Sequence, residues 1–187
     1  CDPYLHVEER LLLTRRCLEL IDRYEFGVAV QTKSARILRD FDLLTSINEK
    51  AKAIVQITLT TYDEDLCKKI EPDVSTTKER IDVLMKCKEA GIPTVVWLTP
   101  ILPFINDTAD NIKNLLDACV DAGVKGIIFW GIGVTLRDGD REYFYHALDK
   151  DFPGMKEKYI RTYGNAYNLP SPNEKMLIPM IVEQCQK

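Results

Sequence analysis

Two short apolar segments carry polar side chains on one face, and these side chains could bind a small molecule. In residues 28–33, Gln31 and Lys33 share one face. In residues 54–61, Thr58 and Thr60 also share one face. A lysine at a strand end can bind an anion such as a carboxylate, and hydroxyl groups can hydrogen-bond a bound ligand. Strands buried on both sides read as continuous apolar runs, so these polar faces indicate a polar interior, as in a barrel whose mouth binds a ligand. Solvent exposure of an edge strand, or threonines hydrogen-bonded in the core, would give the same pattern.

The cysteines are too scattered to form a local metal site. The chain contains Cys1, Cys17, Cys67, Cys87, Cys119 and Cys185. No two of them are spaced as CxxC, which excludes a zinc ribbon and a contiguous iron–sulfur motif. They fall within helical patterns of a chain too large to be a disulfide-rich miniprotein, so we expect reduced thiols and a cytoplasmic location.

The remaining ionisable groups indicate no reaction by themselves. His6 and His146 lie near opposite ends of the chain, without metal-binding partners nearby in the sequence, and we expect both at the surface. Asp138, Asp140 and Glu142 have the spacing of metal-binding carboxylates, but no EF-hand sequence follows them, and a solvated helix start explains them as well. These motifs therefore assign no catalytic residue and no metal ligand.

Length and charge limit the classes of protein to consider. The chain has 187 residues, of which 45% are hydrophobic and 29% charged, values typical of a single globular domain. No apolar run is long enough to cross a bilayer, so we expect no membrane partner. The formal net charge is −4, so no overall positive field attracts nucleic acid.

Strand-like and helix-like segments alternate along the first three quarters of the chain. The predicted strands are residues 28–33, 54–61, 94–99 and 124–130. The predicted helices are residues 7–26, 37–51, 63–70, 76–90 and 108–123. This βα rhythm is typical of a parallel sheet with helical crossovers, either an open doubly wound sheet or a (βα) barrel.

The chain is predicted to form a single α/β domain over residues 1–187. Residues 1–137 would form the βα units, and residues 138–187 would form C-terminal helices, one of them starting at Ser171-Pro172. Four strands cannot close a barrel. A partial barrel would carry its helices on the outer face only, whereas helices on both faces would indicate the doubly wound alternative.

A set of short segments, in conserved order and spacing, resembles the radical S-adenosylmethionine (SAM) proteins related to spore photoproduct lyase, often labelled DNA repair photolyases. The segments are Cys1-Asp2-Pro3-Tyr4, Thr32-Lys33-Ser34, Arg39-Asp40, Ile57-Thr58-Leu59-Thr60-Thr61, Ile70-Glu71-Pro72, Glu79-Arg80, Ala90-Gly91-Ile92, Pro100-Ile101-Leu102-Pro103, Gly133-Val134-Thr135-Leu136-Arg137-Asp138, Arg141-Glu142-Tyr143-Phe144 and Tyr163-Gly164-Asn165. The resemblance covers nearly the whole chain. It implies a partial TIM-type barrel that holds a [4Fe–4S] cluster and SAM.

The resemblance is incomplete where the cluster would bind. Members of the family hold the cluster with a CxxxCxxC loop upstream of the matched region, and this sequence has no such loop. We therefore expect the chain to be a fragment that lacks the cluster-binding part and is inactive alone. The truncated sheet would expose the edge at residues 28–33, and we expect self-association, or packing on a partner chain, along that edge.

Lys33 is the first cofactor contact that the resemblance implies. It would meet the carboxylate of the methionyl moiety of SAM. A lysine removed from water needs a partner, and the alternative is a salt bridge to a nearby acid such as Asp40 or Asp2.

The resemblance implies further cofactor contacts along the strand ends. Thr58 would hydrogen-bond the ribose or amino-acid part, at a position where the lyases have serine, and Thr60 shares its face. Cys1 lies where a cofactor-facing serine precedes the aspartate. The backbone around Leu98 and Pro100 would flank the adenine.

Two functional hypotheses follow from these observations. The first is a radical enzyme, whose complete form cleaves SAM and uses an adenosyl radical on a substrate, with DNA repair as one candidate. The second is a non-catalytic α/β binding domain that has kept the scaffold and lost the cluster. The family resemblance favours the first, because Lys33 and Thr58 are both present.

Overall fold

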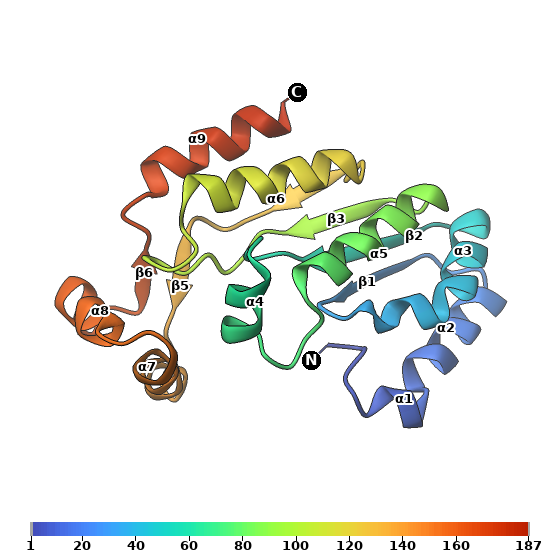
Figure 1. Cartoon of the computed structure of the whole chain (residues 1–187). Helices are drawn as coiled ribbons and strands as arrows, with labels where there is room; N and C mark the ends of the chain where they lie inside the picture. The colour runs from blue at the N-terminus through green and yellow to red at the C-terminus, as the bar shows by residue number, and fades with distance from the viewer. Residues whose placement is uncertain (1, 187) are drawn as a thin grey trace.

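The centre of the molecule is a parallel sheet in the computed structural model, which describes residues 2–186. The strands are β1 (Val28–Thr32), β2 (Ala53–Thr58), β3 (Thr94–Trp97) and β4 (Gly126–Ile128). They are adjacent in chain order, and each neighbouring pair is parallel (Figure 1). The predicted fold class is confirmed, although the predicted strands 54–61 and 124–130 are longer than those observed.

Helices connect the strands, because parallel pairing requires a long crossover. They are α1 (Glu8–Leu11), α2 (Leu13–Arg23), the 3₁₀ helix η1 (Ala35–Asp40), α3 (Phe41–Lys50), α4 (Glu64–Ile70), α5 (Thr77–Glu89) and α6 (Ala109–Asp121). The start of α5 shows how the local sequence sets these bounds. The Thr76 hydroxyl accepts a hydrogen bond from the Glu79 N–H, and the Glu79 carboxylate accepts one from the Thr76 N–H, so two otherwise unpaired backbone donors are satisfied.

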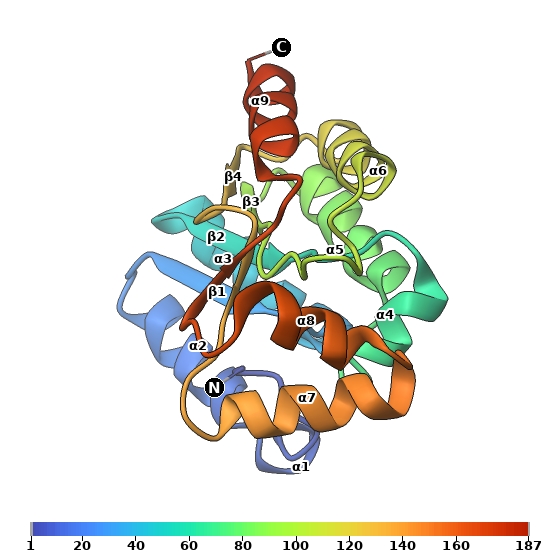
Figure 2. The same ribbon diagram turned by 90° about the vertical axis from the view of Figure 1, so that its left-hand side faces the viewer.

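These helices cover one face of the sheet. Helix α3 contacts β2, and α5 contacts β2 and β3. Figure 2 shows α5 and α6 on the same side of the strands. Along each strand, alternate side chains point into this layer, so that Val55, Ile57 and Val96 are fully buried. The one-sided arrangement is that of a partial barrel and not of a doubly wound sheet.

The opposite face of the sheet is open and carries the polar rows seen in the sequence. Gln31 of β1 lies beside Gln56 of β2 in the parallel register. Trp97 of β3 donates a hydrogen bond from its indole N–H to the Gln56 side-chain oxygen at 2.6 Å. Ala29 and Ile54, also on this face, are exposed. The polar faces inferred from alternation are therefore adjacent parts of one surface, corresponding to a barrel interior.

The C-terminal part forms a smaller layer beyond the carboxyl ends of the strands. Its elements are β5 (Gly133–Thr135), α7 (Asp140–Asp151), α8 (Met155–Tyr163), β6 (Asn168–Pro170) and α9 (Glu174–Cys185). Strands β5 and β6 form an antiparallel pair, and α9 returns to pack on α6. Helices were predicted over residues 138–187, whereas β5 and β6 were not, because a strand of three residues is too short to show a periodic pattern.

A buried hydrogen-bond cluster joins this layer to the loop that precedes α6. The hydroxyl of Ser171 donates to the Asp107 carboxylate at 2.5 Å, and the Asn173 amide donates to the Asp107 carbonyl at 2.9 Å. Burial raises the pKa of Asp107, which the hydrogen bond from Ser171 partly opposes. Ser171 and Asn173 lie just before α9, so the cluster fixes where the chain returns to the main core.

Candidate functional site

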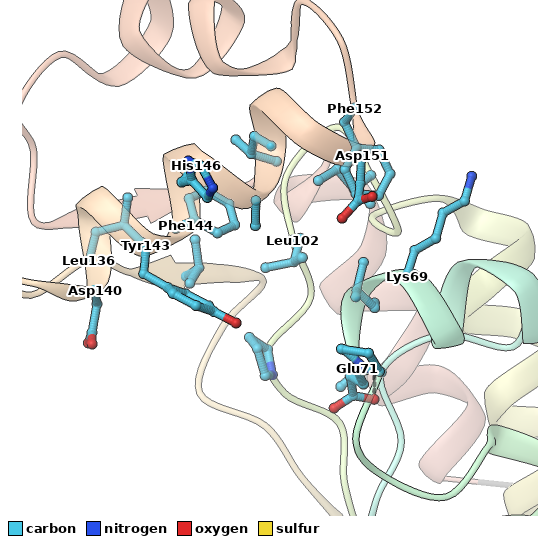
Figure 3. Close-up of a pocket in the computed structure, with 18 of the residues that line it drawn as sticks. Lys69, Glu71, Leu102, Leu136, Asp140, Tyr143, Phe144, His146, Asp151 and Phe152 are labelled. Carbon is cyan, nitrogen blue, oxygen red and sulfur yellow. Dashed lines mark hydrogen bonds between the residues drawn. The ribbon is translucent and has the colours of Figure 1, made fainter.

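A cavity of about 620 Å³ lies between the carboxyl ends of the strands and the C-terminal layer (Figure 3). Lys33, Thr60 and Pro100, which follow β1, β2 and β3, form one side of it. Helix α7 and strand β5 form the opposite side. Side chains at the carboxyl ends of parallel barrel strands are where such folds build their binding sites, and the volume suits a small molecule.

Lys33 is held at the edge of this cavity by a carboxylate. Its ammonium nitrogen lies 2.5 Å from Glu71 Oε1, and a third of the lysine side chain remains exposed. Glu71 follows α4 and is the acid partner, in place of the Asp40 and Asp2 considered from sequence. An ammonium group has three N–H donors, so Lys33 can donate to a bound anion while it keeps its contact with Glu71.

Glu71 is itself fixed by three donors. Besides Lys33, its Oε2 accepts hydrogen bonds from Arg80 at 2.8 Å and from the Thr60 hydroxyl at 2.9 Å. Burial alone would raise the pKa of Glu71, but the charges of Arg80 and Lys33 outweigh it and hold the pKa below its usual value. Glu71 is therefore a carboxylate at neutral pH that orients one lysine and one hydroxyl.

Arg80 of α5 anchors this arrangement from inside the core. Its side chain is completely buried. Besides Glu71, it donates to the carbonyl of Thr58 at 2.9 Å and to the carbonyl of Ser75 at 2.7 Å. A buried guanidinium must be paired and hydrogen-bonded, and here its donors reach the end of β2 and the loop that joins α4 to α5. Arg80 thus ties the strand end to the acid that holds Lys33.

Asp2 fixes the end of β1 from the other side. Its carboxylate accepts hydrogen bonds from the Thr32 hydroxyl at 2.7 Å, the Lys33 N–H at 2.8 Å and the Tyr4 N–H at 2.8 Å. The backbone of Lys33 is therefore held by Asp2, while its side chain is held by Glu71. Asp40 has a separate role, because it pairs with Arg15 and Arg39.

The loop after β2 is equally restrained. The carbonyl of Thr60 accepts hydrogen bonds from the amides of Asn106 and Asn111, at 2.8 and 3.1 Å. The carbonyl of the next residue, Thr61, accepts one from the Thr77 hydroxyl. These side chains hold a loop that lacks strand pairing, so the Thr60 hydroxyl is preorganised beside Glu71.

The predicted cofactor contacts are only partly brought together. Lys33, Thr60 and Pro100 line the cavity, whereas Thr58 and Leu98 do not. Thr58 lies on the open-face row of β2 with only 4% of its surface exposed, and the Leu98 side chain is buried in the core. The sixth position, Cys1, lies outside the described residues.

Sequence reasoning did not identify the residues that support the site. Glu71 and Arg80 lie in two of the segments that carry the resemblance, so their presence was noted, but their contact was not predicted. Tyr143 and Asp151, on α7, also line the cavity and were not singled out as ligand contacts. Tyr143 lies in one of the segments that carry the resemblance, and that is the sequence signal that could have indicated it.

Of the two cofactors that the family resemblance implies, the described residues offer a donor for SAM but no ligand set for an iron–sulfur cluster. Among residues 2–186, no group of three or more histidine, cysteine, aspartate or glutamate side chains is arranged to hold a metal ion, so these residues do not fit an iron–sulfur cluster. The described cysteines, residues 17, 67, 87, 119 and 185, are all free thiols. The donor set at Lys33 does fit a carboxylate such as that of SAM, because it offers an oriented ammonium at a cavity edge. No helix in the described part of the chain has the length and apolar character that a bilayer span needs.

Comparisons with known proteins find distant relatives. No family model matches the chain. An uncharacterised protein of Mycobacterium tuberculosis is 24% identical over 176 residues, covering 94% of this chain and 51% of that protein. An uncharacterised protein of Acidianus two-tailed virus is 30% identical over 177 residues, covering 90% of this chain and 57% of that protein. The chain therefore spans about half the length of the curated relatives that it matches.

A solved structure supports the fold. A domain of pyruvate-formate lyase-activating enzyme from Bacteroides vulgatus superposes with a TM-score of 0.51 and 14% sequence identity, covering 75% of this chain and 88% of that domain. This enzyme belongs to the radical SAM family. The likeness concerns the fold and does not bear on a relation to spore photoproduct lyase. The parallel sheet with helices on one face is the arrangement of a partial barrel, a fold that this chain shares with that domain.

Proposed function

We propose that this chain is the part of a radical SAM enzyme that binds the methionyl end of SAM, with Lys33 as the contact for the cofactor carboxylate. The observation that carries the proposal is the position of the Lys33 ammonium, at a strand end beside the cavity, where Glu71 orients it and Asp2 fixes its backbone. A charge-assisted hydrogen bond to such an oriented donor is among the stronger polar contacts in proteins.

The residues of this chain would bind and orient the cofactor. SAM would supply the adenosyl radical only after taking one electron from a reduced [4Fe–4S] cluster, which the complete enzyme would have to provide. Lys33 would bind the carboxylate. Thr60 would offer its hydroxyl oxygen to the amino-acid or ribose part, and Pro100 would flank the adenine. Thr58, Leu98 and Cys1 stay contacts that the family resemblance alone implies. Leu102 and other apolar residues of the cavity would exclude water from the bound molecule.

A narrower proposal is that the complete enzyme is a lyase related to spore photoproduct lyase, and that it acts in the cytoplasm. Its support is the order and spacing of the matched segments, from Thr32-Lys33-Ser34 to Tyr163-Gly164-Asn165. The net charge of −4 gives no support to a nucleic-acid substrate. Because the sequence lacks the CxxxCxxC loop, we propose that this chain alone is inactive.

The test is the affinity of the complete, cluster-loaded protein for SAM, measured by titration calorimetry with wild type and Lys33→Met. Losing one charge-assisted bond costs about 1.5–3 kcal/mol, so we expect roughly 10- to 150-fold weaker binding. The matched control is Lys50→Met. Lys50 is also ion-paired, with Asp22 at 2.8 Å, and is similarly exposed, but it lies outside the cavity.

The outcomes separate the two functional hypotheses. Weaker binding in Lys33→Met, with an unchanged Lys50→Met, supports the radical SAM proposal. Equal affinity of wild type and Lys33→Met removes Lys33 from the site. No binding of SAM to the complete wild-type protein contradicts the proposal as a whole and favours a binding domain that has lost the cofactor.

A further inference from the structure

The side of the cavity formed by α7 has a chemistry of its own, distinct from that around Lys33. Leu136 and Phe152 give this side an apolar surface, and Leu102, from the loop after β3, faces the same space. Figure 3 shows Tyr143 extending from α7 into the cavity with its hydroxyl toward the opposite side. More than three quarters of Tyr143 is exposed, so this ring is available to a ligand and does not serve the core.

Asp151 is the polar group that stands out on this side. It is the last residue of α7, and Figure 3 shows its carboxylate pointing into the cavity. Asp151 is only partly exposed, yet within residues 2–186 its carboxylate takes part in no hydrogen bond or ion pair. By contrast Asp149, two residues earlier, is paired with Lys156 at 2.6 Å.

The C-terminal end of helix α7 makes a negative charge at Asp151 less favourable. The carbonyl groups at the end of α7 give that end a partial negative charge, which favours cations and disfavours anions. Asp151 therefore adds a second negative group where the helix already presents one. Besides Lys33, two lysines line the cavity, but Lys69 extends past Asp151 away from the cavity (Figure 3), and Lys150 forms no ion pair with Asp151 in the described structure.

We propose that the α7 side of the cavity binds a small molecule that carries a positively charged amine on an apolar, ring-sized body. The amine would pair with Asp151 at the end of α7, and the apolar body would lie against Phe152, Leu102 and the Tyr143 ring. This inference rests on the proposed function, because it assigns the substrate class of the same cavity, beside the cofactor. The volume of about 620 Å³ limits the ligand to a small molecule.

Three indole probes that differ in charge test this inference on the full-length protein. Tryptamine carries an amine, tryptophol a neutral hydroxyl and indole-3-propionate a carboxylate. We expect tryptamine to bind about tenfold more tightly than tryptophol and more tightly still than indole-3-propionate, as measured by titration calorimetry with and without saturating SAM. In Asp151→Asn the preference for tryptamine should disappear, while Asp149→Asn, on the same helix but outside the cavity, should retain it.

Several results would overturn the inference. They are an absence of tryptamine binding, equal binding of the carboxylate probe, and an unchanged preference in Asp151→Asn with a native melting curve. Displacement of tryptamine by SAM would also overturn it, since Asp151 would then belong to the cofactor site. None of these results decides the proposed function. That function is tested separately, by comparing the SAM affinity of Lys33→Met with that of the wild type.

Discussion

Replacing Glu71 by Gln should destabilise the protein far more than removing Lys33. The Glu71 side chain is 10% exposed and its partner Arg80 is completely buried, so the neutral amide leaves a guanidinium without its counter-charge. Removing one partner of a buried ion pair costs about 3–5 kcal/mol. We expect the lower end, about 3 kcal/mol, because Arg80 keeps its hydrogen bonds to the carbonyls of Thr58 and Ser75.

Urea unfolding followed by circular dichroism measures this difference in the free energy of unfolding. With an m-value of about 2 kcal/mol/M, a loss of about 3 kcal/mol lowers the urea midpoint by about 1.5 M. Lys33→Met is the comparison, because Lys33 is a third exposed and its pair with Glu71 is worth less than about 1 kcal/mol. If Glu71→Gln and Lys33→Met had the same midpoint, the reasoning that Arg80 depends on Glu71 would be refuted.

The pH dependence gives a second check on Glu71. Its pKa in the folded protein lies below its ordinary value of 4.5, so its carboxylate contributes stability fully above about pH 4.5. That contribution is lost as the pH falls through the lower, folded pKa. The stability gap between wild type and Glu71→Gln should therefore be constant near neutral pH and narrow in acid. A gap that widened on acidification would contradict the assigned direction of the shift.

Two further predictions concern the C-terminal layer and the sheet edge. A Cβ at Gly133 would lie 2.4 Å from the carbonyl oxygen of Leu169, so Gly133→Ala should destabilise the β5–β6 pair by about 1–3 kcal/mol. The expected sign is faster proteolysis between residues 165 and 175. An unchanged rate of proteolysis there would contradict the prediction. Strand β1 pairs only with β2 in the described sheet, and Ala29 is exposed, so light scattering should show concentration-dependent self-association that Ala29→Lys reduces. A monodisperse monomer at high concentration would rule out association through this edge.

The order of the four parallel strands and their connecting helices was predictable because these elements have strong local signals. Gly91 shows this for the end of α5, since it adopts a φ of 67°, a conformation that glycine reaches without strain and that ends the helix as predicted. The polar rows through Gln31 and Gln56 were visible as alternation, because successive side chains of a strand point to opposite faces. Because one face of these strands is polar, as in a barrel interior, we expected helices to cover only the other face.

The contacts of the site depend on distances along the chain that no local pattern encodes. Lys33 and Glu71 are separated by 38 residues, and their contact requires both the end of β1 and the turn after α4 to be in place. The nearby acids Asp2 and Asp40 were reasonable partners by sequence, but Asp2 is used by backbone donors and Asp40 by two arginines. Asp151 was not recognised because its unpaired state is visible only when the cavity is seen.

A crystal structure of the complete protein with SAM bound tests most directly whether Lys33 binds the carboxylate of SAM. We expect Lys33 Nζ about 2.8 Å from a methionyl carboxylate oxygen, while Glu71 still holds the lysine from the other side. A structure in which the carboxylate lies elsewhere, with the Lys33 ammonium bonded to Glu71 alone, would contradict it.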